Sequence, residues 1–275
     1  DDLYLPGKLG LQVEYLDEHP DVDLVASGYQ YIDARGNFLR EEKPWLGEEQ
    51  ITTLSLLRRG LTVIHAVTMR RESFEKSGGF DARFRGPEDM DLWFRLGLQG
   101  CRMAWLKEVV CQYRIHATST SFQVERHHAH YVQVLDNFFA HKNVPKEIED
   151  EKKYIYMRCN LSFAGRHYGV GNVDEGKILL EETIRQNPDE FNPRVSIKVL
   201  DIIVGWERLV FVSNPMNFWS RVLQHLPENL QNQSIFARDL SLHLAKYRFY
   251  GGYNRNEFTQ VKKQWWKIFI LEPNW

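Results

Sequence analysis

The sequence predicts an α/β part followed by an all-helical part, and three observations support this division. Up to about residue 121, short apolar runs rich in β-branched residues alternate with helical patterns, which is typical of an α/β layer arrangement. From residue 122 on, strand-like runs largely stop and helical periodicity continues between proline-containing breaks. The 275 residues are 43% hydrophobic and 26% charged, which is the composition of a globular protein. We therefore expect two domains, residues 1–121 and residues 122–275.

The first predicted helix spans residues 5–19, where Leu9, Val13 and Leu16 recur at helical spacing and form the expected buried face. The apolar run at residues 22–33 that follows it predicts a strand. Further strands are expected at residues 38–39, 63–69 and 103–114, and further helices at residues 48–59, 71–77 and 87–97. Glycines end three of these helices, at positions 60, 78–79 and 100.

The helical part contains a weak internal repeat. Residues 155–188 and 245–273 each show two helical patterns, small residues where helices would cross, and a closing proline. This resembles the tetratricopeptide helix–turn–helix unit of about 34 residues. An ordinary helical bundle, in which proline simply ends helices, remains an equally open alternative.

Charge and cysteine content exclude several classes of protein. A formal net charge of −2 argues against a nucleic-acid binder that works by bulk charge. The three cysteines are too scattered for a disulfide framework or a zinc site, which favours a reducing, cytoplasmic setting. No apolar run approaches the roughly 18–20 residues that span a bilayer.

The chain opens on two adjacent carboxylates, Asp1 and Asp2, followed by Pro6. Carboxylate oxygens at such a site can bind a hard divalent cation, which in turn would hold a diphosphate. The alternative is a helix-start signal, because an acidic residue near a helix N-terminus complements the helix dipole.

A second acidic cluster, Glu88-Asp89-Met90-Asp91, begins the predicted helix at residues 87–97. A carboxylate crowded by like charges has a raised pKa, which suits a general base. Asp89 and Trp93 are four residues apart and share a helix face, whereas Asp91 is turned away. An ordinary acidic helix start above an apolar core face is the alternative.

The third motif follows the last predicted strand and carries Arg114, His116, Ser119 and Ser121. A cation, an imidazole and hydroxyls in one loop can bind phosphate oxygens or a metal. The alternative is a polar surface loop. We expect this segment to lie over one cleft that both acidic clusters share.

In order and spacing, the three motifs resemble those of the inverting glycosyltransferases of family 2, which have the GT-A fold with a Rossmann-like sheet and flanking helices. The resemblance covers residues 1 to about 121. The opening acid pair with Pro6 and Leu9 is similar to the second half of the family's metal and diphosphate motif. Residues 88–96 resemble the catalytic segment, and residues 113–121 resemble the closing loop.

The resemblance implies roles for individual residues. Asp89 would be the general base that deprotonates the acceptor hydroxyl, with Glu88 beside it. Mg²⁺ or Mn²⁺ would be held by Asp1, Asp2 and His116. The diphosphate would be contacted by Arg114, His116 and Ser119. The expected function is sugar transfer from a nucleotide-sugar donor to an acceptor hydroxyl with inversion, the acceptor being a saccharide or a lipid-linked sugar of bacterial polysaccharide biosynthesis.

One departure from the family pattern is large. Family members have roughly 90 further residues before the position that matches Asp1, and these bind the base and ribose of the donor. We therefore expect this fragment to be inactive alone, with an exposed sheet edge that favours a homodimer. Peripheral association with a membrane is a further expectation. The rival function is a helical protein-interaction module without catalysis.

The His127-His128-x-His130 cluster is a further candidate for metal binding. It lacks a nearby carboxylate and the H-E-x-x-H spacing of a zinc protease. We therefore expect these histidines to lie on a solvated helix face.

Overall fold

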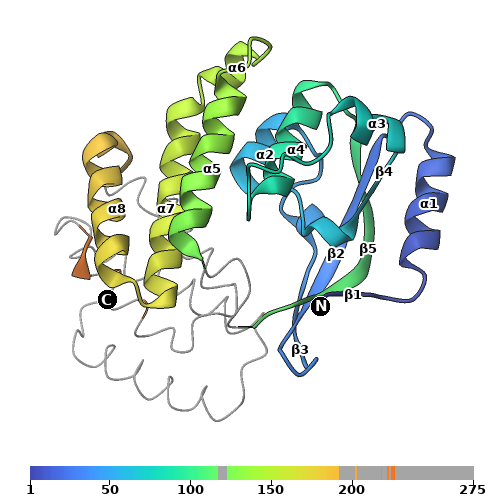
Figure 1. Ribbon diagram of the computed structural model, residues 1–275, viewed down its shortest axis with the longest axis horizontal. Coiled ribbons are helices and arrows are strands. Elements are labelled where there is room, and N and C mark those ends of the chain that lie inside the picture. The colour runs from blue at the N-terminus through green and yellow to red at the C-terminus, as the bar shows by residue number, and fades with distance from the viewer. Residues whose placement is uncertain (117–122, 192–201, 203–217, 219–221, 223, 227–275) are drawn as a thin grey trace, which may run out of the picture.

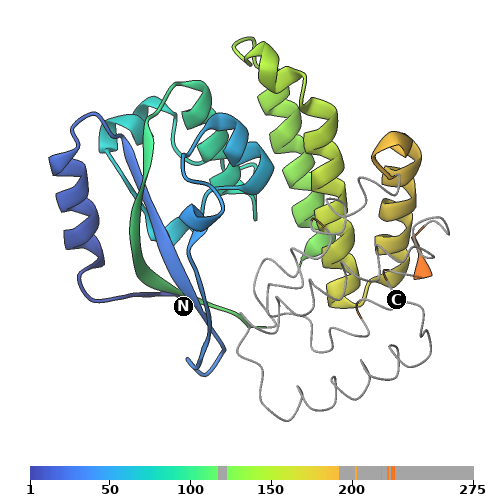
Figure 2. The same ribbon diagram turned by 180° about the vertical axis from the view of Figure 1, so that it is seen from behind.

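The computed structural model describes residues 1–116 and 123–191, together with residues 202, 218, 222 and 224–226. Within these residues, a five-stranded mixed sheet with flanking helices is followed by a layer of long helices (Figures 1 and 2). The predicted order, an α/β part and then a helical part, is confirmed. Ser119 and the second copy of the weak repeat lie outside the described residues.

Two long strands form the centre of the sheet. β2 (Leu24–Ile32) and β5 (Met103–Arg114) run parallel to each other. The short β1 (Leu3–Tyr4) pairs antiparallel with the outer edge of β5. On the other side, β2 pairs antiparallel with both β3 (Phe38–Glu42) and β4 (Val67–Met69), so the sheet is mixed and not wholly parallel.

Alternating side chains of β2 pack on opposite faces of the sheet, because successive side chains of a strand point in opposite directions. Val25 belongs to a small apolar cluster with Leu16 of α1 (Lys8–Glu18). Leu24 and Ala26 belong to the large core with α2 (Thr53–Arg59) and α4 (Glu88–Leu98). Accordingly, α1 covers one face, and α2, α4 and the short α3 (Arg71–Lys76) lie on the other (Figure 1).

The buried face of α1 differs from the prediction. Leu9 and Val13 are 58% and 47% exposed, and Lys8 and Gln12 face the sheet instead. The side-chain amide of Gln12 donates to Ser27 Oγ and to the carbonyl of Ala66, at 2.9 and 2.8 Å. Lys8 Nζ donates to Gln12 Oε1 at 2.7 Å. These bonds satisfy the buried polar groups, so a polar face can pack against the sheet.

Two predicted elements are shorter than expected. The helix expected at residues 48–59 begins only at Thr53, because the Thr52 and Ser55 side chains and main chains bond reciprocally in a capping box. The strand expected at residues 63–69 is a 3₁₀ turn at Ile64–Ala66, and only Val67–Met69 pairs with β2.

The helical part begins with α5 (Val124–Phe139) and α6 (Lys146–Glu149). It continues with α7 (Lys152–Val170), α8 (Val173–Gln186) and a 3₁₀ turn at Pro188–Phe191. α7 and α8 form a helical hairpin in the first copy of the weak repeat, turning at Gly171, whose φ is 92°. The tetratricopeptide likeness stays a prediction.

One apolar core joins the two parts. It contains Leu92 and Trp93 of α4 together with Leu135 and Phe138 of α5 and Phe163 of α7. Direct packing of α5 on α4 and of α7 on α2 carries this core across residue 122. The helical layer therefore lies close enough to the sheet to contribute side chains to a site there.

Among the described helices, none combines the length and the apolar composition that crossing a lipid bilayer requires.

Candidate functional site

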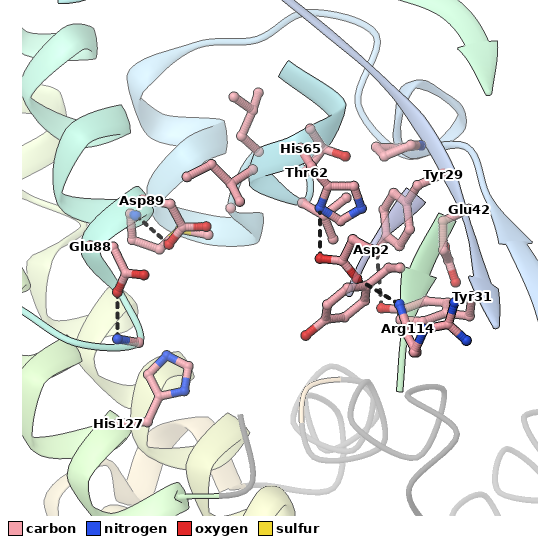
Figure 3. Close-up of a pocket in the computed structure, with 18 of the residues that line it drawn as sticks. Asp2, Tyr29, Tyr31, Glu42, Thr62, His65, Glu88, Asp89, Arg114 and His127 are labelled. Atoms are coloured by element: carbon pink, nitrogen blue, oxygen red, sulfur yellow. Dashed lines mark hydrogen bonds and ion pairs between the residues drawn. The ribbon is translucent and has the colours of Figure 1, made fainter. Parts of the chain in front are cut away.

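A pocket of about 690 Å³ lies between one end of the sheet, the start of α4 and the helices α5 and α7 (Figure 3). It gathers residues that are more than 150 positions apart in the sequence. Six of the seven predicted site residues line it, namely Asp1, Asp2, Glu88, Asp89, Arg114 and His116. The seventh, Ser119, is not described.

Asp1 and Asp2 precede a strand, and the alternative that they start a helix is wrong. α1 begins only at Lys8, after Gly7, while Leu3 and Tyr4 pair with Gln112 and Cys111 of β5. This pairing brings the acid pair to the carboxyl end of β5, beside the third motif.

Both carboxylates at this end contact histidine. Asp1 Oδ2 lies 2.6 Å from His116 Nε2, and Asp2 Oδ2 lies 3.4 Å from His65 Nδ1. Asp2 Oδ1 also accepts from the main-chain N–H of Arg114 at 2.8 Å. Sequence reasoning missed His65, which the turn before β4 supplies.

Several donors of Arg114 bond main-chain oxygens. Its Nε donates to the carbonyl of Asp1 at 3.0 Å, and its Nη1 donates to the carbonyl of Asp33 at 3.1 Å. These bonds hold the chain start and the β2–β3 turn against the end of β5. Arg114 therefore positions this end of the pocket, and its contact with phosphate stays a prediction.

The acidic cluster at the start of α4 divides between two environments. Asp89 lines the pocket, and its Oδ1 accepts from the N–H of Met90 at 2.8 Å. Burial, with a smaller contribution from the neighbouring charge of Glu88, raises the pKa of Asp89 to about 7. Glu88 Oε2 accepts from the N–H of Gly86 at 2.5 Å.

Asp91 points away from the pocket, as its position on the helix predicts. It is 5% exposed and forms an ion pair with Arg95, one turn along α4. Arg95 Nη2 also donates to the carbonyl of Gly79 at 2.7 Å. Glu88 and Asp89 thus line the pocket. Asp91 instead holds Arg95, which connects α4 to the loop after α3.

The prediction of a solvated histidine face on α5 is wrong. His127 lines the pocket, His128 Nε2 lies 3.1 Å from Asn160 Oδ1, and His130 Nδ1 accepts from the N–H of Arg85 at 3.0 Å. All three rings are partly buried because α5 packs on α4 and α7. In the sequence, the i, i+4 spacing of His127 and Tyr131 is a signal for one shared helix face.

Three tyrosines, Tyr29, Tyr31 and Tyr113, form a further wall of the pocket. Tyr29 and Tyr31 lie on one face of β2, with hydroxyl oxygens 3.0 Å apart, and Tyr113 is the register partner of Tyr31 on β5. Burial raises the pKa of Tyr31 to about 12, so its phenol stays neutral. Such a wall offers ring faces and hydroxyl groups to a ligand with both apolar and hydroxyl surface.

Asp1, Asp2, His65 and His116 form what we call the acid–histidine end of the pocket, and the described side chains there are not assembled as a metal centre. Within residues 1–116, 123–191 and the few described beyond them, no group of three or more His, Cys, Asp or Glu side chains is arranged to hold a metal ion. The carboxylates of Asp1 and Asp2 are instead paired one to one with His116 and His65.

Comparison with known proteins finds similarity to several proteins named as glycosyltransferases. No family model matches the chain. An uncharacterized glycosyltransferase of Methanocaldococcus jannaschii is 30% identical over 200 residues, which cover 73% of this chain and 61% of that protein. An uncharacterized glycosyltransferase of Rickettsia conorii is 29% identical over 170 residues, which cover 59% and 28%. These relatives support a glycosyltransferase family.

A further relative carries a more specific name. The O-antigen biosynthesis glycosyltransferase WbnJ of Escherichia coli is 29% identical over 123 residues, which cover 44% of this chain and 46% of that protein. The chain thus spans only 28–61% of the length of these three glycosyltransferase relatives.

Proposed function

We propose that this pocket transfers a sugar from a nucleotide-sugar donor to an acceptor hydroxyl with inversion, as in the family 2 glycosyltransferases with the GT-A fold. The observation that carries the proposal is Asp89, a carboxylate on the pocket wall whose pKa of about 7 suits a general base near neutral pH. The named glycosyltransferase relatives support the reaction class.

In the proposed reaction, Asp89 accepts the proton of the acceptor hydroxyl while the acceptor oxygen attacks the anomeric carbon of the donor sugar. The new glycosidic C–O bond forms as the bond from that carbon to the diphosphate oxygen breaks, and the diphosphate leaves with the electron pair. Attack from the face opposite the leaving group inverts the anomeric centre.

The acid–histidine end is proposed to hold the diphosphate, through Arg114, His116 and Ser119. Asp1 and Asp2 would repel a diphosphate, so the proposal includes Mg²⁺ or Mn²⁺ held by Asp1, Asp2 and His116. Carboxylate oxygens are suitable donors for both ions, whereas the imidazole nitrogen is a softer donor that suits Mn²⁺ better than Mg²⁺. Because Asp1 is paired with His116 in the structure, an ion would have to replace that pair.

The acceptor is proposed to be a saccharide or lipid-linked sugar of polysaccharide biosynthesis, which the name of the Escherichia coli relative supports. A cytoplasmic location, peripheral association with a membrane and a homodimer are parts of the same proposal. Sedimentation of the purified protein with and without lipid vesicles tests the last two, and a monomer that leaves vesicles unbound contradicts both.

Replacement of the base tests the reaction most simply. Asp89→Asn in the protein at its full natural length should lower kcat about 100-fold or more, because general-base catalysis contributes about 10²–10⁴-fold. Affinity for the donor should be unchanged, since the amide occupies the same volume. Asp17→Asn, on the exposed face of α1, is the matched control.

Transfer would be followed by mass spectrometry of the product and donor binding by calorimetry. Full activity of Asp89→Asn contradicts the proposed base. In the same assay, EDTA should abolish transfer and Mn²⁺ should restore it, and unchanged turnover after removal of divalent ions contradicts the proposed cation.

A further inference from the structure

The helical part supplies one wall of the pocket. His127 and Tyr131 lie one turn apart on α5, and Arg166 reaches the pocket from α7. In Figure 3, His127 lies on the same side of the pocket as Glu88 and Asp89, whereas Asp2, His65 and Arg114 lie on the opposite side. The pocket therefore has an end that α4, α5 and α7 share, which contains the proposed base.

Arg166 determines which nitrogen of His127 carries the proton. Arg166 Nη1 lies 3.2 Å from His127 Nδ1. A guanidinium can only donate, so Nδ1 must accept and the proton of a neutral ring is on Nε2. Burial and the positive charge of Arg166 lower the pKa of His127 to about 3, so the ring is neutral near physiological pH.

Phe163 fixes both groups. The Arg166 guanidinium lies 4.5 Å from the centroid of the Phe163 ring, and the His127 ring meets Phe163 edge-on at 5.4 Å between centroids. Phe163 itself is 2% exposed within the common core. The orientation of the imidazole is therefore set before any ligand binds.

The imidazole lies directly against the loop that leads into the base. A Cβ atom added to Gly86 would be 3.1 Å from His127 Cδ2 and 3.5 Å from Nε2. Gly86 has a φ of 110°, which favours glycine, and its N–H is bonded to Glu88. A fixed, neutral N–H donor thus lies beside the Glu88–Asp89 helix start.

We propose that His127, positioned by Arg166, binds the acceptor sugar, its Nε2–H donating to an acceptor hydroxyl oxygen beside Asp89. The inference rests on the proposed function and deepens it by naming the helical part as the acceptor-selecting wall. A hydroxyl group accepts and donates at once, so it can take the imidazole N–H and give its own proton to a carboxylate. A neutral imidazole beside two acids suits an uncharged saccharide.

The tautomer can be tested in the unaltered chain. Nitrogen-15 NMR of the histidine side chains near neutral pH should show His127 as the neutral Nε2–H form. The variant Arg166→Met should shift the resonances of His127. A ring protonated on Nδ1, or a charged ring, overturns the proposal without reliance on the folding of any variant.

Binding gives the second test and needs no donor or transfer. Saturation-transfer NMR with a panel of methyl hexopyranosides should show contact with the unaltered chain. The affinity of the bound glycosides should fall about tenfold in His127→Phe, since loss of one hydrogen bond leaves a buried hydroxyl unsatisfied. His127→Gln, which keeps an N–H donor, should retain most of the affinity.

His128→Phe is the matched control, because His128 also stacks on Phe163, with ring centroids 4.7 Å apart, but does not line the pocket. Equal binding by His127→Phe and the unaltered chain overturns the proposal, as does equal loss in both phenylalanine variants or no contact with any glycoside. Failure of transfer with these binding results intact would reject the proposed reaction and leave the subsite standing.

Discussion

Asp89 and Asp91 are two residues apart on one helix and lie in different environments. Asp91 is almost fully buried against Arg95, whose guanidinium lies 2.6 Å from it. Asp89 lies on the pocket wall, and burial raises its pKa to about 7. The same acidic cluster therefore supplies a structural ion pair and a candidate base, and the environment of each carboxylate decides which it is.

The raised pKa of Asp89 predicts a pH dependence of stability. The folded-state pKa of about 7 exceeds the ordinary 3.8, so the folded state binds this proton more tightly than the unfolded state. Stability from this group is present at low pH and is lost as pH rises between these two values. The free energy of unfolding of the unaltered chain, relative to Asp89→Asn, should therefore fall between about pH 5 and about pH 8.

Urea denaturation of both proteins at the two pH values measures this difference, and other titrating groups cancel in the comparison. Asp17→Asn, in which an exposed carboxylate is lost, should show no such change. A difference between the unaltered chain and Asp89→Asn that is constant with pH contradicts the raised pKa.

At the residue scale, the sequence predicts the acids better than their partners. Asp1, Asp2, Glu88 and Asp89 are adjacent in pairs, so local spacing reveals them. His65, Tyr29 and Arg166 reach the pocket from other elements, and no local pattern relates them to the acids. The sequence pattern places His127 in solvent, because the packing of α5 on α4 is not visible in a single sequence.

At the scale of elements, β2 is the most constrained strand because it pairs with three others. Gly28 lies within it, at the place where the register with β5 shifts. A Cβ at Gly28 would be 2.6 Å from the carbonyl oxygen of Glu42 and 2.9 Å from the Trp45 ring. This glycine therefore allows β3 and the turn after it to approach β2 closely.

Gly28→Ala should lower the free energy of unfolding by about 1–3 kcal/mol, because the added methyl group forces the hairpin away from β2. Gly10→Ala is the opposite case, since Gly10 is exposed within α1 and a Cβ there meets nothing within 4 Å. It should raise stability by about 0.5–1 kcal/mol. Urea unfolding of the two variants checks both signs, and a neutral Gly28→Ala contradicts the close approach.

Element type was more predictable than element boundaries and faces. The periodicity indicates α1, α4, β2 and β5 correctly, because each is long enough to show a pattern. The predicted buried face of α1 is wrong, because hydrophobicity alone marks the exposed Leu9 and Val13 as buried. The amide of Gln12 bonds Ser27 and Ala66, residues that only the folded chain brings near it.

At the scale of the whole molecule, the α/β part and the helical part share one core. Leu135 of α5 is fully buried in the same cluster as Leu24 of β2 and Leu92 of α4. The boundary near residue 122 marks a change of secondary structure in the sequence. The continuous core favours cooperative folding of the two parts over folding as two independent units.

Leu135→Ala should lower the free energy of unfolding by about 2–5 kcal/mol, the usual cost of such a cavity. Because the core is shared, hydrogen exchange should show a similar loss of protection in the slowest amides of β2 and β5 as in those of α7. Loss of protection confined to α5 and α7 would contradict a single cooperative unit.

The sequence predicts the order of the two parts, but it does not show that the second completes the pocket of the first. That result depends on how α5 and α7 pack on α4 and α2, which no single-sequence pattern encodes. The two helical patterns of residues 155–188 correspond to the hairpin of α7 and α8, in which α7 brings Arg166 to the pocket wall.

The pH profile of sugar transfer by the protein at its full natural length tests directly whether Asp89 is the general base. With Asp89 as the base, kcat/KM should be low in acid and rise through an apparent pKa near 7, as the carboxylate loses its proton. The residual rate of Asp89→Asn should lack that rise. The same titration in the variant as in the unaltered protein would contradict Asp89 as the base.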